Sequence, residues 1–137
     1  MKLAYPYTAT PQQPSGYLVQ FVDFDEGITE GETLEEAAFA AAEVLSGVLA
    51  YRIDHEQAVP VPSAPDGRPL ASPSAAVQSS LLLREARGDR PMSELARALQ
   101  TSWAAAQRLE DPHHWPSLKQ LDRAARVLGK RLVLSLE

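Results

Sequence analysis

The chain contains no cysteine, which excludes disulfide bonds and thiolate-based metal or redox sites. This absence fits a reducing compartment, and we expect a cytoplasmic location. The seven glycines are scattered and form no glycine-rich loop that could cradle a phosphate group. There is no G-x-S-x-G motif and no Ser/His/Asp set in a recognisable context. The sequence therefore predicts neither an enzyme nor a bound cofactor.

Long apolar runs are also missing. The opening MKLAYPYTATPQQP holds one lysine and no extended apolar stretch, and no later segment reaches transmembrane length. We therefore expect no signal peptide, no membrane-spanning helix and no membrane partner. The 137 residues, 45% of them hydrophobic, suffice for one domain or two very small ones with a packed core.

Charge is distributed unevenly along the chain. Residues 1–80 hold three basic and eleven acidic side chains, a net charge of −8. Residues 81–137 hold ten basic and seven acidic side chains, a net charge of +3. This asymmetry suggests two partners of opposite charge, although two ordinary surfaces that differ by chance remain the alternative.

The first part of the chain has the pattern of a small α+β domain, expected over residues 1–62. One helix, which Thr33 caps and which should end near Arg52, is expected to cover a small antiparallel sheet. The proline-rich AVPVPSAPDG after the helix can form an edge strand or an extended linker, but not a central strand. We place a linker over 63–73. Two strands are predicted from the runs rich in Val, Tyr, Phe and Leu at 3–9 and 16–24, and GITEGET at 27–33 is read as a short third strand.

The second domain, expected over 74–137, has helical patterns followed by one strand. RLVLSLE at 131–137 alternates apolar and polar or small residues, which indicates a half-buried strand. A lone terminal strand needs a partner, and we favour its copy in a second subunit, with Leu132, Leu134 and Leu136 forming a dimer interface. The four helices are expected at 73–88, 92–99, 103–110 and 117–129.

Two of these helices are separated only by Gln100–Ser102, a connection typical of a helix-turn-helix. Ala96 is small and would let the two helices cross closely, and Ser102 suits the N-cap of the second helix. Glutamine can read adenine in the major groove, and arginine can bind guanine or a phosphate. A plain four-helix bundle is the alternative. The outward-facing candidates for DNA contact are Trp103, Ala104, Gln107 and Arg108, together with the cap Ser102.

The loop after the second of these helices holds two adjacent histidines, His113 and His114. Without further ligands they make a poor metal pair, so we expect no metal site. Contact with the DNA backbone and an ordinary loop remain equally open for them. Trp115 is expected to fill the space between the third and fourth helices.

These segments resemble HicB-type antitoxins. SELARALQTSWAAAQRLEDPHHWPSLKQLDRAARVLGKRL is similar to the Cro/XRE-like helix-turn-helix at the C-terminus of that family. GYLVQFVDFDEGITEGETLEEAAFAAAEVL resembles the family's strand-turn-strand-helix core, and VPVPS resembles its proline-rich edge segment. The resemblance covers nearly the whole chain in the family's order.

The resemblance implies an antitoxin that forms a homodimer or a higher oligomer. Its N-terminal domain would have a partial RNase H-like fold and bind a small basic HicA-like ribonuclease toxin, and its C-terminal domain would bind operator DNA of its own operon. Two positions depart from the helix-turn-helix pattern. Met92 stands where the family often has a phosphate-contacting glutamine, and Gln100 stands where the turn often has glycine. A stand-alone transcription regulator with a sensing N-terminal domain is the alternative.

Five carboxylates around the third strand are candidates for contact with the toxin. Asp23 and Asp25 are two apart on a segment expected to be extended, so they could share one face. An RNase H-like nuclease would need further carboxylates converging on Mg²⁺, and the chain offers no clear set. A solvated acidic edge that discourages aggregation is the other alternative. The five are Asp23, Asp25, Glu26, Glu30 and Glu32.

Overall fold

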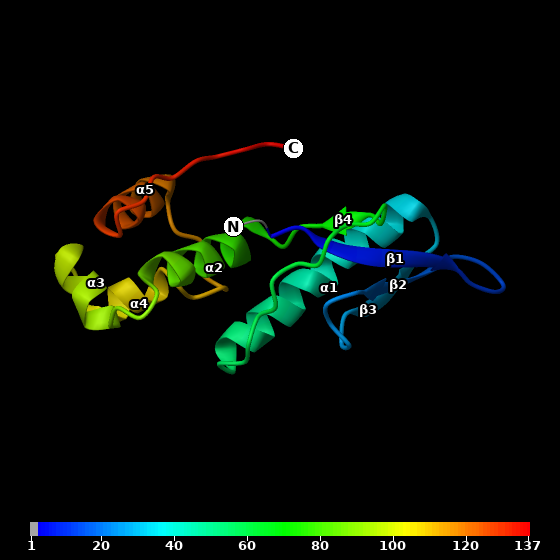
Figure 1. The fold of residues 1–137 in the computed structure, drawn as a ribbon, viewed down its shortest axis with the longest axis horizontal. Helices are drawn as coiled ribbons and strands as arrows, with labels where there is room; N and C mark the ends of the chain where they lie inside the picture. Colours follow the sequence, from blue (N-terminus) through cyan, green and yellow to red (C-terminus); the bar gives the residue numbers. More distant parts are fainter. Residues whose placement is uncertain (1–2) are drawn as a thin grey trace. The chain divides into compact units, whose positions relative to one another are not determined.

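The computed structural model describes residues 3–137. The chain divides into unit 1, up to Ser74, and unit 2, from Ala75 onward. Each unit is described by itself, and Figure 1 shows the elements of both. Residues 3–137 contain no helix with the length and apolar character needed to cross a membrane. Unit 1 contains β1 (Tyr5–Pro11), β2 (Tyr17–Phe21), β3 (Ile28–Gly31), α1 (Leu34–Asp54) and β4 (Leu70–Ala71). Unit 2 contains α2 (Ala75–Arg87), α3 (Met92–Ala98), α4 (Trp103–Arg108) and α5 (Leu118–Val127).

Unit 1 is a four-stranded antiparallel sheet with one helix on one face, which confirms the expected α+β class (Figure 1). The strand order is β3-β2-β1-β4, and Tyr7 lies opposite Phe21 in the β1–β2 pair. Alternate residues of a strand share a face, so Tyr5, Tyr7, Val19 and Phe21 are buried beneath α1. The helix packs on them with Ala37, Ala41, Leu45, Leu49 and Ile53.

Helix α1 begins directly after β3 and lies close to it. The Thr33 hydroxyl accepts a hydrogen bond from the Glu36 N–H at 3.1 Å, which confirms the expected N-cap. A Cβ on Gly31 would lie 2.4 Å from the backbone nitrogen of Ala37. Only glycine allows this approach, so Gly31 fixes how closely the helix meets the strand.

The proline-rich segment after α1 is held to the sheet by hydrogen bonds. The Tyr5 hydroxyl donates to the carbonyl oxygen of Pro60 at 2.7 Å. The Asp23 carboxylate accepts from the backbone N–H of Ser63 at 3.0 Å and from the Ser63 hydroxyl. These contacts join residues far apart in sequence, which is why composition alone suggested a linker.

Strand β4 corrects the boundaries that we expected for this segment. It pairs with β1, with Tyr5 opposite Ala71, so the predicted linker over 63–73 is wrong for its last part. The edge strand lies after the proline cluster rather than within it, because proline cannot donate to a strand ladder. Unit 1 continues to Ser74, beyond the limit expected at residue 62.

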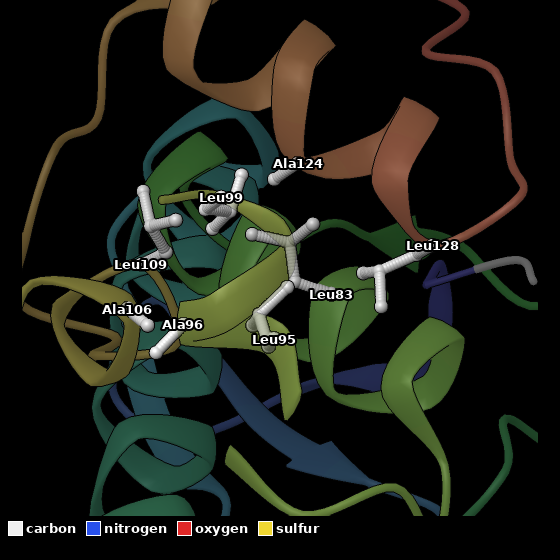
Figure 2. Packing of buried hydrophobic residues seen from close by; sticks show 8 residues of the cluster. All are labelled: Leu83, Leu95, Ala96, Leu99, Ala106, Leu109, Ala124 and Leu128. Atoms are coloured by element: carbon white, nitrogen blue, oxygen red, sulfur yellow. The ribbon is translucent and has the colours of Figure 1, made fainter. Parts of the chain in front are cut away.

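Unit 2 is built around an aliphatic core in which no aromatic side chain takes part. The four helices occupy the segments where they were predicted. Ala96 and Ala106 are small members of the core on α3 and α4, which lets these two helices pack closely (Figure 2). The cluster consists of Leu83, Leu95, Ala96, Leu99, Ala106, Leu109, Ala124 and Leu128.

The C-terminal segment 131–137 does not form the predicted strand within this chain. Leu134 is 67% exposed and Leu136 is fully exposed, whereas Leu132 is half-buried. A strand needs a hydrogen-bonding partner, and unit 2 contains no other strand among residues 75–137. Pairing with a second copy stays a prediction.

Candidate nucleic-acid and protein interfaces

Helix α4 is short and presents a polar outer side. The Ser102 hydroxyl accepts a hydrogen bond from the Ala105 N–H at 3.1 Å, so the expected N-cap is confirmed. Ala106 is fully buried and anchors the helix on the core, while Ala105 is half-buried. The structure brings the remaining candidates together on the exposed side: Trp103, Ala104, Gln107 and Arg108.

The turn between α3 and α4 contains one residue in the left-handed backbone conformation. Gln100 has a φ of +54°, the conformation in which glycine is usually found. The Thr101 N–H donates to the carbonyl oxygen of Ala96 at 3.0 Å, and the Gln100 N–H donates to that of Arg97 at 3.1 Å. These two bonds form a Schellman motif. Gln100 thus adopts a backbone conformation that glycine takes more easily, at a cost in strain.

A buried ion pair fixes the end of α4 against α2. Glu110, 5% exposed, accepts hydrogen bonds from Arg87 Nε at 2.6 Å and Nη2 at 3.0 Å. The hydrogen bond to Glu110 raises the pKa of Arg87 above its usual value, although burial opposes this. Ser80, also buried, donates its hydroxyl to the Glu110 carbonyl oxygen at 2.5 Å. Sequence reasoning missed this pair, because no periodic pattern links residues 23 positions apart.

Two further arginines join the ends of the helices. Arg123 of α5 donates to the carbonyl oxygen of Leu99 at 2.6 Å, at the C-terminus of α3. Arg90 donates to the carbonyl oxygens of Ala86 at 2.6 Å and Leu128 at 3.4 Å. Several of the basic residues of unit 2 therefore stabilise its fold, which leaves fewer of them for a partner.

The loop between α4 and α5 corrects one prediction. Trp115 is 67% exposed and does not fill the space between the helices, because Leu109 and Ala124 already occupy the core there. His113 is exposed and its backbone N–H donates to the Asp111 carboxylate at 2.9 Å, while His114 is half-buried.

The five acidic candidates fall into two groups at opposite ends of β3. Near the β1–β2 turn, Glu30 accepts from Gln12 Nε2 and Glu32 accepts from the Ser15 hydroxyl, both at 3.0 Å. Asp23, Asp25 and Glu26 lie in the connection between β2 and β3. The single acidic cluster suggested by the sequence is therefore divided.

In the β2–β3 connection, Asp23 and Asp25 do not share an extended segment, because residues 22–23 and 25–26 are bends. Asp23 binds Ser63, Asp25 is exposed, and Glu26 forms an ion pair with Arg52 at 2.7 Å. Burial raises the pKa of Tyr5 to about 12, the charge of Asp23 adds to this effect, and Arg52 opposes it. Asp23 and Glu26 thus have structural partners in this connection, whereas Asp25 is exposed, as are Glu30 and Glu32 with their hydrogen bonds to Gln12 and Ser15.

Comparisons with known proteins agree on one family. Residues 4–79 match the family model described as "HicB_like antitoxin of bacterial toxin-antitoxin system". The chain is 34% identical to Antitoxin HicB of Escherichia coli (strain K12) over 140 aligned positions, covering 96% of this chain and 98% of that protein. It is 28% identical to Antitoxin HicB 1 of Photorhabdus laumondii, covering 98% of this chain and 88% of that protein.

Proposed function

Because the chain belongs to the HicB-like antitoxin family, we propose that it neutralises a small basic ribonuclease toxin and represses transcription of its own operon. Unit 1 would bind the toxin and cover its active site. Unit 2 would bind operator DNA. The observation that carries this proposal is the family match together with the opposite net charges of the two units, −8 and +3.

Support for toxin binding comes from the composition and fold of unit 1. All charges counted for residues 1–80 fall within residues 1–74, so the net charge of −8 belongs to this unit. A strongly negative surface attracts a cationic protein over long range and raises the rate of association. The family model matches residues 4–79, which is essentially this unit.

DNA binding rests on the geometry of α3 and α4. We interpret them as a helix-turn-helix in which α4 enters the major groove, with Gln107 and Arg108 as base or phosphate contacts. Ser102, Trp103 and Ala104 at the start of α4 would lie near the DNA, and His113 and His114 would lie near its backbone.

Dimerisation would complete the DNA-binding form. The exposed leucines of segment 131–137 provide an unpaired strand sequence that can pair with its copy in a second chain, giving a homodimer or higher oligomer. Two α4 helices would then face successive major grooves about one helical turn apart, so the operator should be palindromic.

The experiment is a paired binding assay on the full-length chain. The toxin probe is the small basic protein encoded beside this gene, and the DNA probe is the upstream region of the gene pair. We expect binding to both, with DNA binding that weakens as salt rises because phosphate contacts release counterions. Binding to the DNA but not to the toxin would identify a stand-alone regulator instead.

A further inference from the structure

Helix α1 carries an open groove on the side that the sheet does not cover. The groove has a volume of about 420 Å³ and is lined by Val44, Gly47, Val48 and Tyr51, with Glu26 and Arg52 at its edge. All of these residues belong to unit 1. Tyr51 is 56% exposed and its ring stacks on that of His55 at a centroid distance of 3.9 Å, so the groove has a firm aromatic wall.

Gly47 is an unusual residue for this position. It lies in the middle of a 21-residue helix, where glycine costs about 1 kcal/mol of stability relative to alanine. Apart from its chain neighbours and the nearby backbone of α1, no atom of the described residues lies within 4 Å of the place where its Cβ would be, so the packing of unit 1 does not require glycine here. A glycine that the fold does not need, on the floor of an apolar groove, leaves room for an incoming side chain or backbone.

The negative charge of unit 1 favours a cationic partner for this groove. Among residues 3–74 the two cationic side chains, Arg52 and Arg68, are both in ion pairs, with Glu26 at 2.7 Å and Asp66 at 3.9 Å. Glu43, one turn before Gly47, is exposed. A second copy of this unit would bring another net charge of −8 to the same place, which opposes self-association. A cationic protein gains from the same field.

We propose that the α1 groove around Gly47 is the docking site for the toxin, which inserts an apolar side chain flanked by basic residues. This inference rests on the proposed function, because it requires that unit 1 bind a basic toxin. It goes further by placing the apolar contact on the side of α1 next to Glu26, while the other carboxylates around β3 contribute charge around that contact. Buried apolar anchors usually carry most of the energy of such an interface, while charges at the rim set its rate of formation.

The test uses the full-length chain and the toxin encoded beside it. Gly47→Gln fills the groove and should weaken toxin binding by roughly 100-fold, whereas the matched control Ala38→Gln, on an exposed part of α1 outside the groove, should change it less than about two-fold. Gly47→Gln replaces glycine by a better helix former, so its melting temperature should equal or exceed that of the original chain. A loss of affinity therefore would not reflect misfolding.

Other outcomes separate the two hypotheses. If the original chain binds the toxin and Gly47→Gln binds it equally well, the groove is not the docking site, although the antitoxin function stands. If the original chain binds no toxin, the proposed function fails and this inference fails with it. If Gly47→Gln leaves toxin binding intact but reduces the mass of the free chain in sedimentation, the groove packs against a second copy instead.

Discussion

The two units of this chain build their cores in different ways. Unit 1 packs aromatic residues, with Tyr5 and Phe24 ring centroids 5.1 Å apart and Tyr7 and Phe21 centroids 5.7 Å apart. Unit 2 packs leucine and alanine and leaves both tryptophans of the chain, Trp103 and Trp115, exposed. Small aliphatic residues allow short helices to cross closely, while a sheet with a single covering helix needs larger side chains to fill its core.

The units also differ in how they use charge. In unit 1 the acidic residues greatly outnumber the basic ones, which gives the unit a net charge of −8. In unit 2, Arg87, Arg90 and Arg123 bind carboxylate or carbonyl oxygens within the fold. Unit 1 therefore carries an excess of negative charge, whereas in unit 2 several basic side chains are bonded within the fold.

The largest effect is expected from breaking the buried ion pair of unit 2. Glu110→Leu leaves the partly exposed Arg87 without its carboxylate and should lower the free energy of unfolding of unit 2 by about 3 kcal/mol, the low end of the range for a buried pair. Tryptophan fluorescence during urea unfolding reports this unit alone, because both tryptophans lie in it. The double variant Arg87→Met/Glu110→Leu should recover most of the loss, since neither charge remains. A single variant as stable as the original chain would show that the pair does not hold α4.

The next largest effect is expected on operator binding when the exposed polar side chains of α4 are removed. Gln107→Ala/Arg108→Ala should weaken binding to operator DNA by about 3 kcal/mol, roughly two orders of magnitude in Kd. Both side chains are exposed, so unfolding should be unchanged. An electrophoretic mobility shift assay at fixed salt measures the Kd. The control is Arg97→Ala, which removes an exposed side chain of α3. An unchanged Kd would favour a plain four-helix unit.

A smaller effect is expected in unit 1, where the free energy of unfolding should depend on pH through Tyr5. The pKa of Tyr5 is raised to about 12 in the folded state from 10.0. The contribution of the un-ionised Tyr5 to the free energy of unfolding is therefore fully present below pH 10 and is lost as pH rises toward 12. The expected loss is about 2 kcal/mol, because only the unfolded chain ionises readily in this range. Circular dichroism in urea at several pH values measures it. Tyr5→Phe should flatten this dependence, and a dependence of the same size in that variant would contradict the assignment.

The smallest effect concerns the turn of unit 2. Gln100→Gly should stabilise the unit by about 1 kcal/mol, because glycine adopts the observed φ of +54° without strain. Tryptophan fluorescence in urea measures the change. Gln100→Ala should be close to neutral, and equal stability of the glycine and alanine variants would show that the left-handed conformation costs nothing here.

The sequence predicted the elements whose signals are local. Thr33 and Ser102 were identified as N-caps because a capping side chain acts within one turn, and both cap helices, as Ser117 does at the start of α5. The three longer strands were predicted from β-forming residues between turn signals, and the five helices from helical spacing and from start and stop residues, all of which are also local. The outward face of α4 could also be predicted, since it is the complement of the core positions.

Features that depend on distant contacts could not be predicted. Strand β4 is only two residues long and is defined by its pairing with β1, and the Arg87–Glu110 pair joins separate helices. Trp115 was placed in the core by its size, but the leucines and alanines nearby fill that space. Asp23 and Glu26 were read as free carboxylates because their partners, Ser63 and Arg52, lie far along the chain.

The division of labour between the units is the central claim, and one variant tests it directly. Asp25→Lys/Glu30→Lys reverses two exposed charges of unit 1 and changes no residue of unit 2. The affinities of this variant for the toxin and for operator DNA should be measured at the same salt concentration. We predict that toxin binding weakens by roughly ten-fold or more while the operator Kd changes less than about two-fold. Toxin binding that stays intact, or a parallel loss of both affinities, would contradict the account.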